Sequence, residues 1–477
     1  MQNYKTKLTT HREFYPAQDL DWSIESDRGR IISAPSFRRL QKRTQVFALE
    51  LNAAVRSRLT HSLEVSQTAR FIAKTILKKL DDENLKELEN AFVSTAEMAS
   101  LLHDIGNPPF GHFGETAINE WMEKQAIIHL NNLVPTNSEL KEQLIKDLCS
   151  YDGNAQAIRI VHKLQRLNLS YTQTASIIKY TRGAFQSRSK EDSLSYLKKK
   201  PGFYYSEKDF VSTVLDTLNI KSGHRFPLTY IMEAADDISY LSADIEDAVD
   251  KGILTLDKIY ELIIEEYKVV NQKYNVNTSL LLNLVEKNYH KAKEKEDEPY
   301  QFNMFLTLTR ASLIYQLVNY VSDLYIKHHE EVFNGSFNSA LLEYDKSHEC
   351  SIAIEVLQNI SYRYIYTHKK VQELEIKGYS IIQGLFNLYE PLLKLTKEQF
   401  TKLVDDKKVD CLICKNLLTR LSKKHLVAYK KSIGELQSNN ENYDLLEWYY
   451  RARLVIDYIS GMTDDYALHE FRSLSAN

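Results

Sequence analysis

The feature that most limits how this chain can fold is a helical repeat of apolar residues with few turn-forming residues to interrupt it. The 477 residues include only 14 glycines and 9 prolines, about half or less of average usage. Segments 58–80 and 227–252 place apolar residues three and four positions apart, as the buried face of a helix requires. Strand-like alternation is sparse. The sequence therefore predicts an all-α protein.

No linker rich in proline, glycine or serine separates the helical segments, so we expect one compact body. The chain is 43% hydrophobic and 26% charged, which is ordinary for a globular protein. Within this body we expect an N-terminal segment over residues 1–27, a catalytic core over residues 28–260 and an additional C-terminal helical region over residues 261–477.

Charge and cysteine content restrict the partners and the compartment. The net charge of −3 provides no overall attraction to nucleic acid, although the basic runs at 198–200 and 423–425 leave local anion or single-stranded DNA contacts open. Cys411 and Cys414 form a lone CxxC pair, which does not favour a zinc site. The N-terminus has no apolar signal core, and no run of about 18 apolar residues exists. We therefore expect a cytoplasmic protein with no membrane contact.

Residues 101–115 concentrate chemically active side chains at the end of an apolar helix. His103 and Asp104 are adjacent there, and His112 and Glu115 follow after a break rich in glycine and proline. The glycine and prolines stop the first helix, and a second helix is expected to start near residue 111. The segment therefore predicts a polar site at a helix–loop–helix junction.

The helix predicted over residues 227–252 carries a second polar face. Its core stripe follows the helical period, whereas Asp236, Tyr240 and Asp244 recur every four residues on the opposite side. A carboxylate, a phenol and a carboxylate in register suit the wall of a polar pocket. A solvent-exposed acidic face is the alternative interpretation of the same pattern.

Four groups can meet if these helices converge, namely His61, His103, Asp104 and Asp236. Two imidazoles and two carboxylates form a mixed nitrogen and oxygen set that suits Mn²⁺, Fe²⁺, Co²⁺, Ni²⁺ or Zn²⁺. Taken alone, His61 would more often be a packed or surface histidine. The combination is much more specific than any single member.

Two further groups are placed to act beside such a metal. His112 and Glu115 are three residues apart and share a helical face, so the carboxylate can orient the imidazole for proton transfer. A helix cap with a surface acid is the alternative interpretation of this pair. Arg58 lies one turn before His61 and could bind a phosphate oxygen.

With these residues, the chain resembles the HD-domain phosphohydrolases and, more narrowly, the bacterial deoxyguanosine triphosphate triphosphohydrolases (dGTPases). The H…HD…D signature is moderately specific. The most specific matching segments are GNPPFGHFGE (106–115), EAADDISY (233–240) and DYISGMTD (457–464). The matching blocks span nearly the whole chain.

The resemblance implies hydrolysis of dGTP to deoxyguanosine and inorganic triphosphate, by water attack at the α-phosphorus, in a helical homo-oligomer that is often a hexamer. It implies one divalent metal ion per subunit, with Mn²⁺ or Mg²⁺ foremost, and a C-terminal region that contributes to the pocket and the oligomer contacts. The implied roles are metal binding by His61, His103, Asp104 and Asp236, catalysis by His112 and Glu115, and substrate binding by Arg58, Gln45, Val46, Lys179, Lys200, Tyr240 and Asp244.

Three other functions stay open at this stage. The spacing does not identify groups that would recognise guanine, so broad-specificity dNTP hydrolysis is the first alternative. An HD phosphohydrolase acting on ppGpp or a cyclic dinucleotide is the second; the register of Tyr240 and Asp244, which suits a deoxyribose, counts against it. A nucleotide-sensing or nucleic-acid-binding HD protein without turnover is the third.

Overall fold

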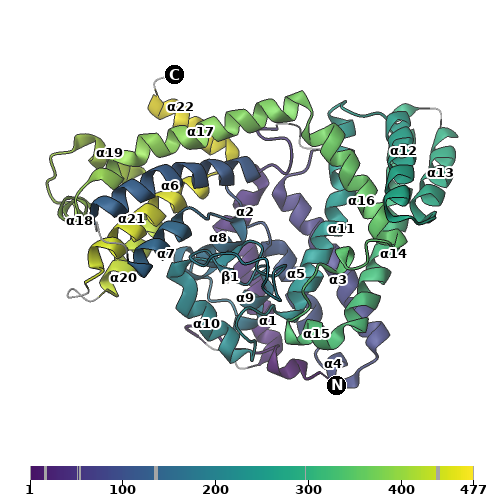
Figure 1. The fold of residues 1–477 in the computed structure, drawn as a ribbon, viewed down its shortest axis with the longest axis horizontal. Helices are drawn as coiled ribbons and strands as arrows, with labels where there is room; N and C mark the ends of the chain where they lie inside the picture. The colour runs from purple at the N-terminus through teal and green to yellow at the C-terminus, as the bar shows by residue number, and fades with distance from the viewer. Residues whose placement is uncertain are drawn as a thin grey trace.

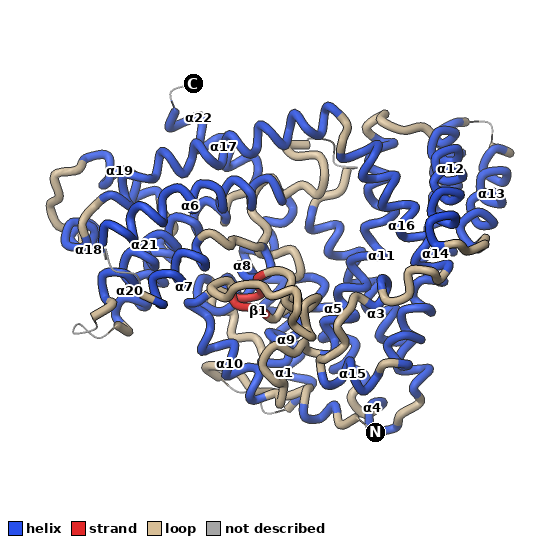
Figure 2. Tube along the Cα trace, viewed as in Figure 1, coloured by secondary structure: helices blue, strands red, loops and turns tan. Residues whose placement is uncertain are grey.

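The computed structural model describes residues 2–15, 19–50, 52, 55–133, 138–295, 297–436 and 441–475. Nearly every regular element in them is helical, which confirms the predicted all-α fold (Figures 1 and 2). The first half of the chain forms α1 (Leu20–Ser33), α2 (Pro35–Arg39), α3 (Arg58–Leu80), α4 (Glu83–Lys86), α5 (Glu89–Leu102), α6 (Gly111–Leu133), α7 (Glu139–Leu148), α8 (Gly153–Arg159), α9 (Tyr171–Ser176), α10 (Lys208–Thr217) and α11 (Pro227–Asp250).

The second half forms α12 (Leu256–Tyr274), α13 (Leu280–Lys293), α14 (Glu298–Lys327), α15 (His329–Asn334), α16 (Glu349–Ile360), α17 (Lys369–Lys394), α18 (Lys397–Val404), α19 (Leu412–Arg420), α20 (Lys423–Gly434), α21 (Tyr443–Ser460) and α22 (Asp464–Ser475). Shorter turns are η1 (Tyr4–Thr6), η2 (Leu40–Lys42), η3 (Ile160–Leu164), η4 (Tyr205–Glu207), η5 (Leu341–Glu343) and η6 (Ser361–Tyr366). Strands β1 (Arg182–Gly183) and β2 (Pro201–Phe203) form one short parallel pair.

Three helices, α3, α5 and α11, pack against one another at the centre of the molecule (Figure 1). Helix α3 starts at a capping box in which the side chains of Ser57 and Thr60 satisfy each other's backbone N–H groups. Nearly all of α5 is buried, and Pro227 begins α11 at the position where a missing N–H costs nothing. The packing of these helices therefore brings the start of α3, the end of α5 and the middle of α11 to one place.

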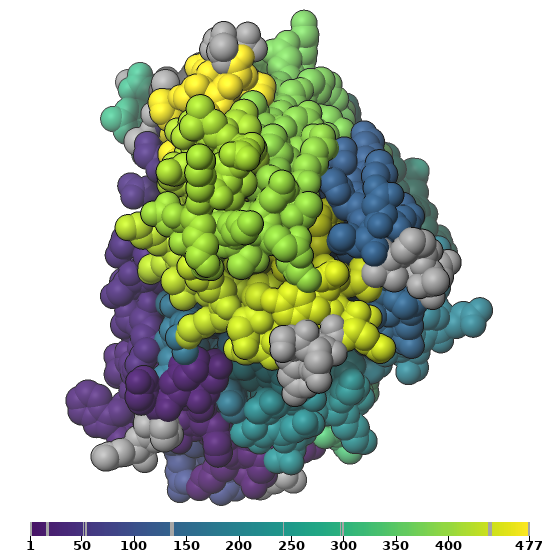
Figure 3. Space-filling view, turned by 90° about the vertical axis from the view of Figure 1, so that its left-hand side faces the viewer, coloured from purple at the N-terminus to yellow at the C-terminus, as the bar shows by residue number. Residues whose placement is uncertain are grey.

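The apolar side chains form two clusters that divide the chain differently from its sequence order. The first cluster joins α1, α3, α5 and α11 to the later helices α12–α16. The second joins α6 and α7 to the C-terminal helices α17–α22, and Figure 3 shows this face of the molecule. Helix α8 lies between the clusters, with Ala155 in the second and Ile158 in the first. The segments expected at 28–260 and 261–477 therefore interleave in space.

A buried ion cluster joins the two halves beside α8. The guanidinium of Arg159 donates to both carboxylate oxygens of Asp457 on α21, with nitrogen–oxygen distances of 2.6 to 2.9 Å. It also donates to Glu207 of η4 at 3.1 Å. All three residues are at most 3% exposed. Because burying charges is costly unless they are paired, this contact fixes the position of α21 relative to α8 and η4.

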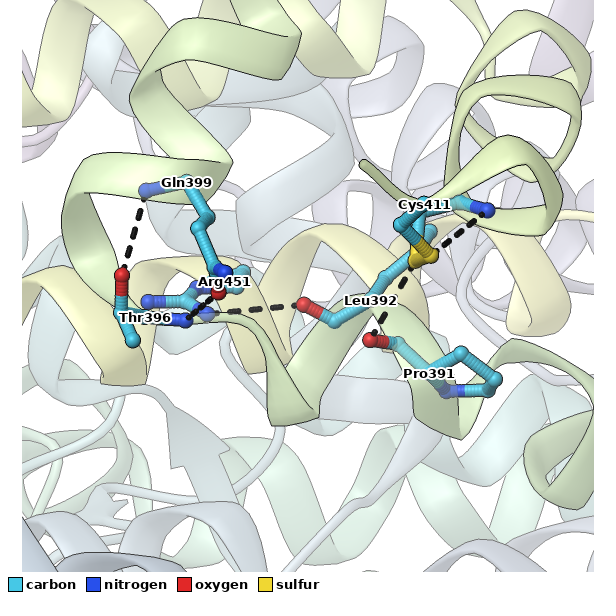
Figure 4. Close-up of a disulfide and its surroundings, with 7 residues drawn as sticks. Pro391, Leu392, Thr396, Gln399, Cys411 and Arg451 are labelled. Atoms are coloured by element: carbon cyan, nitrogen blue, oxygen red, sulfur yellow. Dashed lines mark hydrogen bonds between the residues drawn. A yellow bond between two sulfur atoms is a disulfide. The ribbon is translucent and has the colours of Figure 1, made fainter. Parts of the chain in front are cut away.

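The CxxC pair forms a disulfide between Cys411 and Cys414 at the start of α19. Figure 4 shows Cys411 next to Pro391 of α17, and the Cys414 sulfur lies 3.9 Å from the Pro391 carbonyl oxygen. Cys149 and Cys350 are free. Among the residues that the structure describes, no helix combines the length and apolarity needed to cross a lipid bilayer.

Candidate active site

His61 of α3, His103 at the end of α5 and Asp236 of α11 converge at the centre of the three-helix core. The Asp236 Oδ1 atom lies 3.2 Å from His61 Nε2 and 3.4 Å from His103 Nε2. One nitrogen or oxygen atom from each residue lies within 4.8 Å of the others. The His103 Nδ1–H donates to the Ser100 carbonyl at 2.6 Å, which leaves Nε2 as a ligand atom facing the cluster. The donor set therefore fits a divalent transition metal.

Asp104, the fourth predicted ligand, lies beside this compact trio and is engaged elsewhere. Its Oδ2 accepts from the Arg58 guanidinium at 2.6 Å and lies 3.5 Å from His103 Nε2. Its Oδ1 accepts from the Asn107 side-chain amide. Burial by itself would raise the pKa of Asp104, but Arg58, His103 and His61 together outweigh burial and hold the pKa at about 2. The carboxylate is therefore ionised and held beside the trio, with its two oxygens turned toward Arg58 and Asn107.

A half-buried lysine balances the acids on α11. The Lys179 ammonium lies 3.6 Å from Asp236 Oδ2 and 3.9 Å from Glu233 Oε1. Burial opposes the charge of Lys179, yet these carboxylates raise its pKa. The neighbouring Asp237 differs, because burial raises its pKa to about 8. The site therefore holds fixed charges of both signs close together.

A cavity of about 370 Å³ opens in front of His103 and Asp236, whereas His61 is fully buried and does not line it. His112 lies at its rim with an exposed side chain, and its Nδ1 is 2.9 Å from Glu115 Oε2. The other Glu115 oxygen accepts from the Gly153 N–H at 2.8 Å, which anchors the carboxylate. The imidazole is thus held at one nitrogen while the other is free to face a ligand. The cavity is lined by Gln45, Arg58, His103, Asp104, Asn107, Gly111, His112, Glu115, Asn154, Lys179, Tyr180, Lys200, Asp236, Asp237, Tyr240 and Gln358.

The structure adds a residue that sequence reasoning missed. Tyr366, at the end of the π-helical turn η6, donates a hydrogen bond to Asp244 and contacts the Tyr240 hydroxyl. Asp244 is 1% exposed and does not line the cavity, and burial raises its pKa to about 7. Tyr366 is one of 30 tyrosines in the chain, and its spacing from α11 carries no signal.

The remaining predicted substrate contacts fall into two groups. Gln45 lines the cavity with a buried Oε1 that has no hydrogen-bond partner among the described residues, and Lys200 lines it 3.7 Å from Asp152 Oδ2. Val46 instead packs against the first apolar cluster and is not part of the lining. The lining residues Asn107, Asn154, Tyr180, Asp237 and Gln358 were not predicted from the sequence as site residues.

Comparison with known families agrees with this geometry. Residues 58–182 match the HD domain, and residues 429–473 match the phosphohydrolase-associated domain. The fold and the convergent histidines and aspartate are thus those of an HD-domain phosphohydrolase.

Full-length relatives narrow the assignment. The chain is 41% identical to the deoxyguanosinetriphosphate triphosphohydrolase of Klebsiella pneumoniae subsp. pneumoniae strain ATCC 700721 / MGH 78578, over 99% of this chain and 98% of the relative. It is also 41% identical to the protein of that name from Enterobacter sp. strain 638, over 99% of each chain. The chain belongs to the deoxyguanosinetriphosphate triphosphohydrolase family.

Proposed function

We propose that this protein hydrolyses dGTP to deoxyguanosine and inorganic triphosphate, as the names of its relatives indicate for them. The observation that carries the proposal is the meeting of His61, His103 and Asp236 at a cavity with its own cationic side chains. A small metal-binding set facing lysine and arginine suits a polyphosphate substrate.

We assign metal binding to His61, His103, Asp104 and Asp236. The cation, Mn²⁺ or Mg²⁺ in the first instance, would supply Lewis-acid polarisation of a phosphate oxygen when bound. Asp104 contributes its ionised carboxylate, which Arg58 and Asn107 hold in place. The trio is already close together, because one nitrogen or oxygen atom of each residue lies within 4.8 Å of the others, and the Ser100 carbonyl orients the His103 ring.

The other charged groups have separate roles in this proposal. Lys179, Lys200 and Arg58 neutralise the triphosphate as it departs from the α-phosphorus. His112 transfers a proton to or from water or the leaving oxygen, and Glu115 positions its ring through the 2.9 Å contact. Because Glu115 is itself anchored by the Gly153 N–H, the pair is aligned without a substrate.

Tyr240, with Tyr366 and Asp244 next to it, forms an aromatic wall that accounts for a preference for deoxyribose over ribose. Tyr240 lines the cavity, and Tyr366 and Asp244 hold its hydroxyl end in place from behind. A rigid wall of this kind leaves little room for a 2′-hydroxyl, whereas Gln45 offers an unpaired acceptor to a sugar hydroxyl or a base. This interpretation favours deoxynucleotides over ppGpp or cyclic dinucleotides.

Product analysis tests the reaction class. The purified full chain is incubated with each of the four dNTPs and with Mn²⁺ or Mg²⁺, and the products are separated by anion exchange. We expect inorganic triphosphate and a deoxynucleoside, with dGTP consumed fastest. Equal rates on all four dNTPs would support the broad-specificity alternative, and release of pyrophosphate would contradict the proposed reaction.

Two variants test the assigned residues. Asp236→Asn should lower Mn²⁺ affinity, measured by calorimetry, by at least about 100-fold, because it replaces a ligand that both histidines contact. Asp250→Asn, at the exposed end of the same helix, is the matched control and should bind Mn²⁺ normally. His112→Ala should keep metal and nucleotide binding yet lose most turnover. Full turnover in that variant would remove His112 from catalysis.

The remaining expectations concern assembly, DNA contact and location. We propose a homo-oligomer, with a hexamer as the first expectation, which light scattering measures directly. A binding role for single-stranded DNA would appear as a salt-dependent mobility shift, since phosphate contacts release counterions. A cytoplasmic location accords with the family and is tested by cell fractionation.

A further inference from the structure

A second polar cavity, separate from the active site, lies where α2, α8, α20 and α21 meet. Its volume is about 150 Å³, which corresponds to about five water molecules. It shares no lining residue with the catalytic cavity. The polar lining that matters here consists of Arg39, Gln156, Ser422, Lys424, His425 and Asp457.

The basic side chains of this cavity have no counter-charge of their own. Arg39, Lys424 and His425 make no hydrogen bond or ion pair through their side chains with any residue that the structure describes. Asp457 also lines the cavity, but Arg159 already neutralises it through two hydrogen-bonded oxygens. Arg39 is a half-buried cation without a partner among those residues, whereas Lys424 is exposed and burial lowers the pKa of His425 to about 4, which leaves it uncharged at neutral pH. Because burying an unpaired charge is costly, an anion beside Arg39 would stabilise the fold.

The start of α20 adds further donors to the same cavity. Ser422 is the N-cap of this helix but makes no side-chain capping hydrogen bond, and Lys424 and His425 lie in the first turn. The first backbone N–H groups of a helix have no intrahelical acceptor, and the helix dipole favours negative charge there. Helix starts of this kind bind phosphate and related anions.

Gln156 specifies which anion fits. It is 1% exposed, and its Nε2 donates to Asp457 Oδ1 at 3.0 Å. Its Oε1 is buried and has no hydrogen-bond partner among the described residues. Flipping the amide would place this oxygen against the Asp457 carboxylate, so the oxygen must stay turned away from it. A ligand that satisfies Gln156 needs a hydrogen-bond donor as well as negative oxygens.

We propose that this cavity is a binding site for inorganic hydrogen phosphate. The phosphate oxygens accept from Arg39, Lys424 and the α20 N–H groups, and the phosphate hydroxyl donates to Gln156 Oε1. Sulfate has the same shape but carries no proton at neutral pH, so it leaves the Gln156 oxygen unsatisfied. The small volume suits a free ion rather than a nucleotide.

The site adjoins a contact that supports the active-site loop. Arg43, four residues after Arg39, donates to the carbonyl oxygens of Ser460 and Met462 just after Asp457 on the chain. The same guanidinium donates to the carbonyl of Asn107, which lines the catalytic cavity. A phosphate in this cavity therefore lies next to the residues that hold Asn107 in place, although the phosphate itself does not contact Asn107.

Thermal unfolding of the full chain tests the site. The protein is treated with EDTA and titrated with sodium phosphate or sodium sulfate at constant ionic strength in a phosphate-free buffer. The unfolding midpoint should rise with phosphate concentration, as ligand binding to the folded state requires, and should rise less with sulfate. No shift with phosphate, or equal shifts with both anions, would overturn the proposal.

Variants separate this site from the catalytic cavity. Lys424→Ala and Arg39→Gln should each weaken phosphate binding at least about tenfold, the effect of losing one charged hydrogen bond. The matched control Lys423→Ala removes the same charge from the neighbouring exposed position, which does not line the cavity, and should respond as the unchanged protein does. If Lys200→Ala abolishes the phosphate shift while Lys424→Ala does not, the phosphate binds in the catalytic cavity and the proposal is wrong.

Discussion

Replacing Arg159 with methionine should weaken the contact that joins α8 and η4 to the C-terminal helix α21. Arg159 on α8 is the common partner of Asp457 on α21 and Glu207 on η4, and its guanidinium makes hydrogen bonds to both. Methionine keeps much of the side-chain volume but removes the charge and every donor. Two carboxylates that are at most 1% exposed then lose their positive partner.

The cost can be estimated from the burial of the acids. Removing one partner of a buried ion pair typically costs about 3–5 kcal/mol, because the remaining charge stays desolvated. Here Asp457 keeps the Gln156 amide at 3.0 Å and Glu207 keeps the Ser206 hydroxyl at 2.8 Å, which limits the loss. We therefore expect about 4 kcal/mol, or about a 10³-fold change in the unfolding equilibrium.

Urea unfolding followed by tryptophan fluorescence measures this change. The matched control is Lys79→Met, which removes a 2.8 Å ion pair between α3 and α14 that is largely exposed and should cost less than about 1 kcal/mol. The loss in Arg159→Met should shrink as the pH falls, because the stranded acids acquire raised pKa values in the folded state and protonation relieves them. Equal losses in the two variants would refute the reasoning.

Three further predictions follow from local geometry. A methyl group at Gly378 would lie 2.5 Å from the Phe110 ring, so Gly378→Ala should lower the free energy of unfolding by about 1–3 kcal/mol; Gly434→Ala, which meets open space, should not lower it. Burial lowers the pKa of His425 to about 4, below its unfolded value of about 6.5, so the stability linked to this neutral imidazole is fully present above about pH 6.5 and is lost as the pH falls through 4. His425→Gln should remove up to about 3 kcal/mol of this pH dependence in urea titrations. An unchanged pH profile in the variant would contradict the prediction. Tyr366→Phe should raise the KM for dGTP about tenfold without changing Mn²⁺ affinity, and unchanged kinetics would exclude Tyr366 from the aromatic wall.

Local spacing was sufficient to predict the helices and the polar face of α11. A helix repeats every 3.6 residues, so the sequence alone shows that Asp236 and Tyr240 share a face. The glycine and prolines after Asp104 likewise show where the preceding helix ends. The HD pair and the His112–Glu115 spacing are equally local, and the 2.9 Å contact of that pair follows from three residues of separation.

Contacts between distant segments were decided only by the tertiary structure. Tyr366 reaches Asp244 across 122 residues, and Asp104 is turned toward Arg58 rather than into the compact trio. Neither pairing can be read from periodicity, because a helical repeat defines which face a side chain occupies but not which helix packs against that face.

The division of the core shows the same limit. Helix α6 follows α5 directly in sequence, yet it joins α17–α22 in the second apolar cluster, while α12–α16 join the first. Apolar faces are chemically alike, so their pattern specifies that each must be buried without specifying the partner. The partners are selected by the fit of whole helices and by buried charges such as Arg159. The desolvation cost of burying Arg159 is offset only when it pairs with both Asp457 and Glu207.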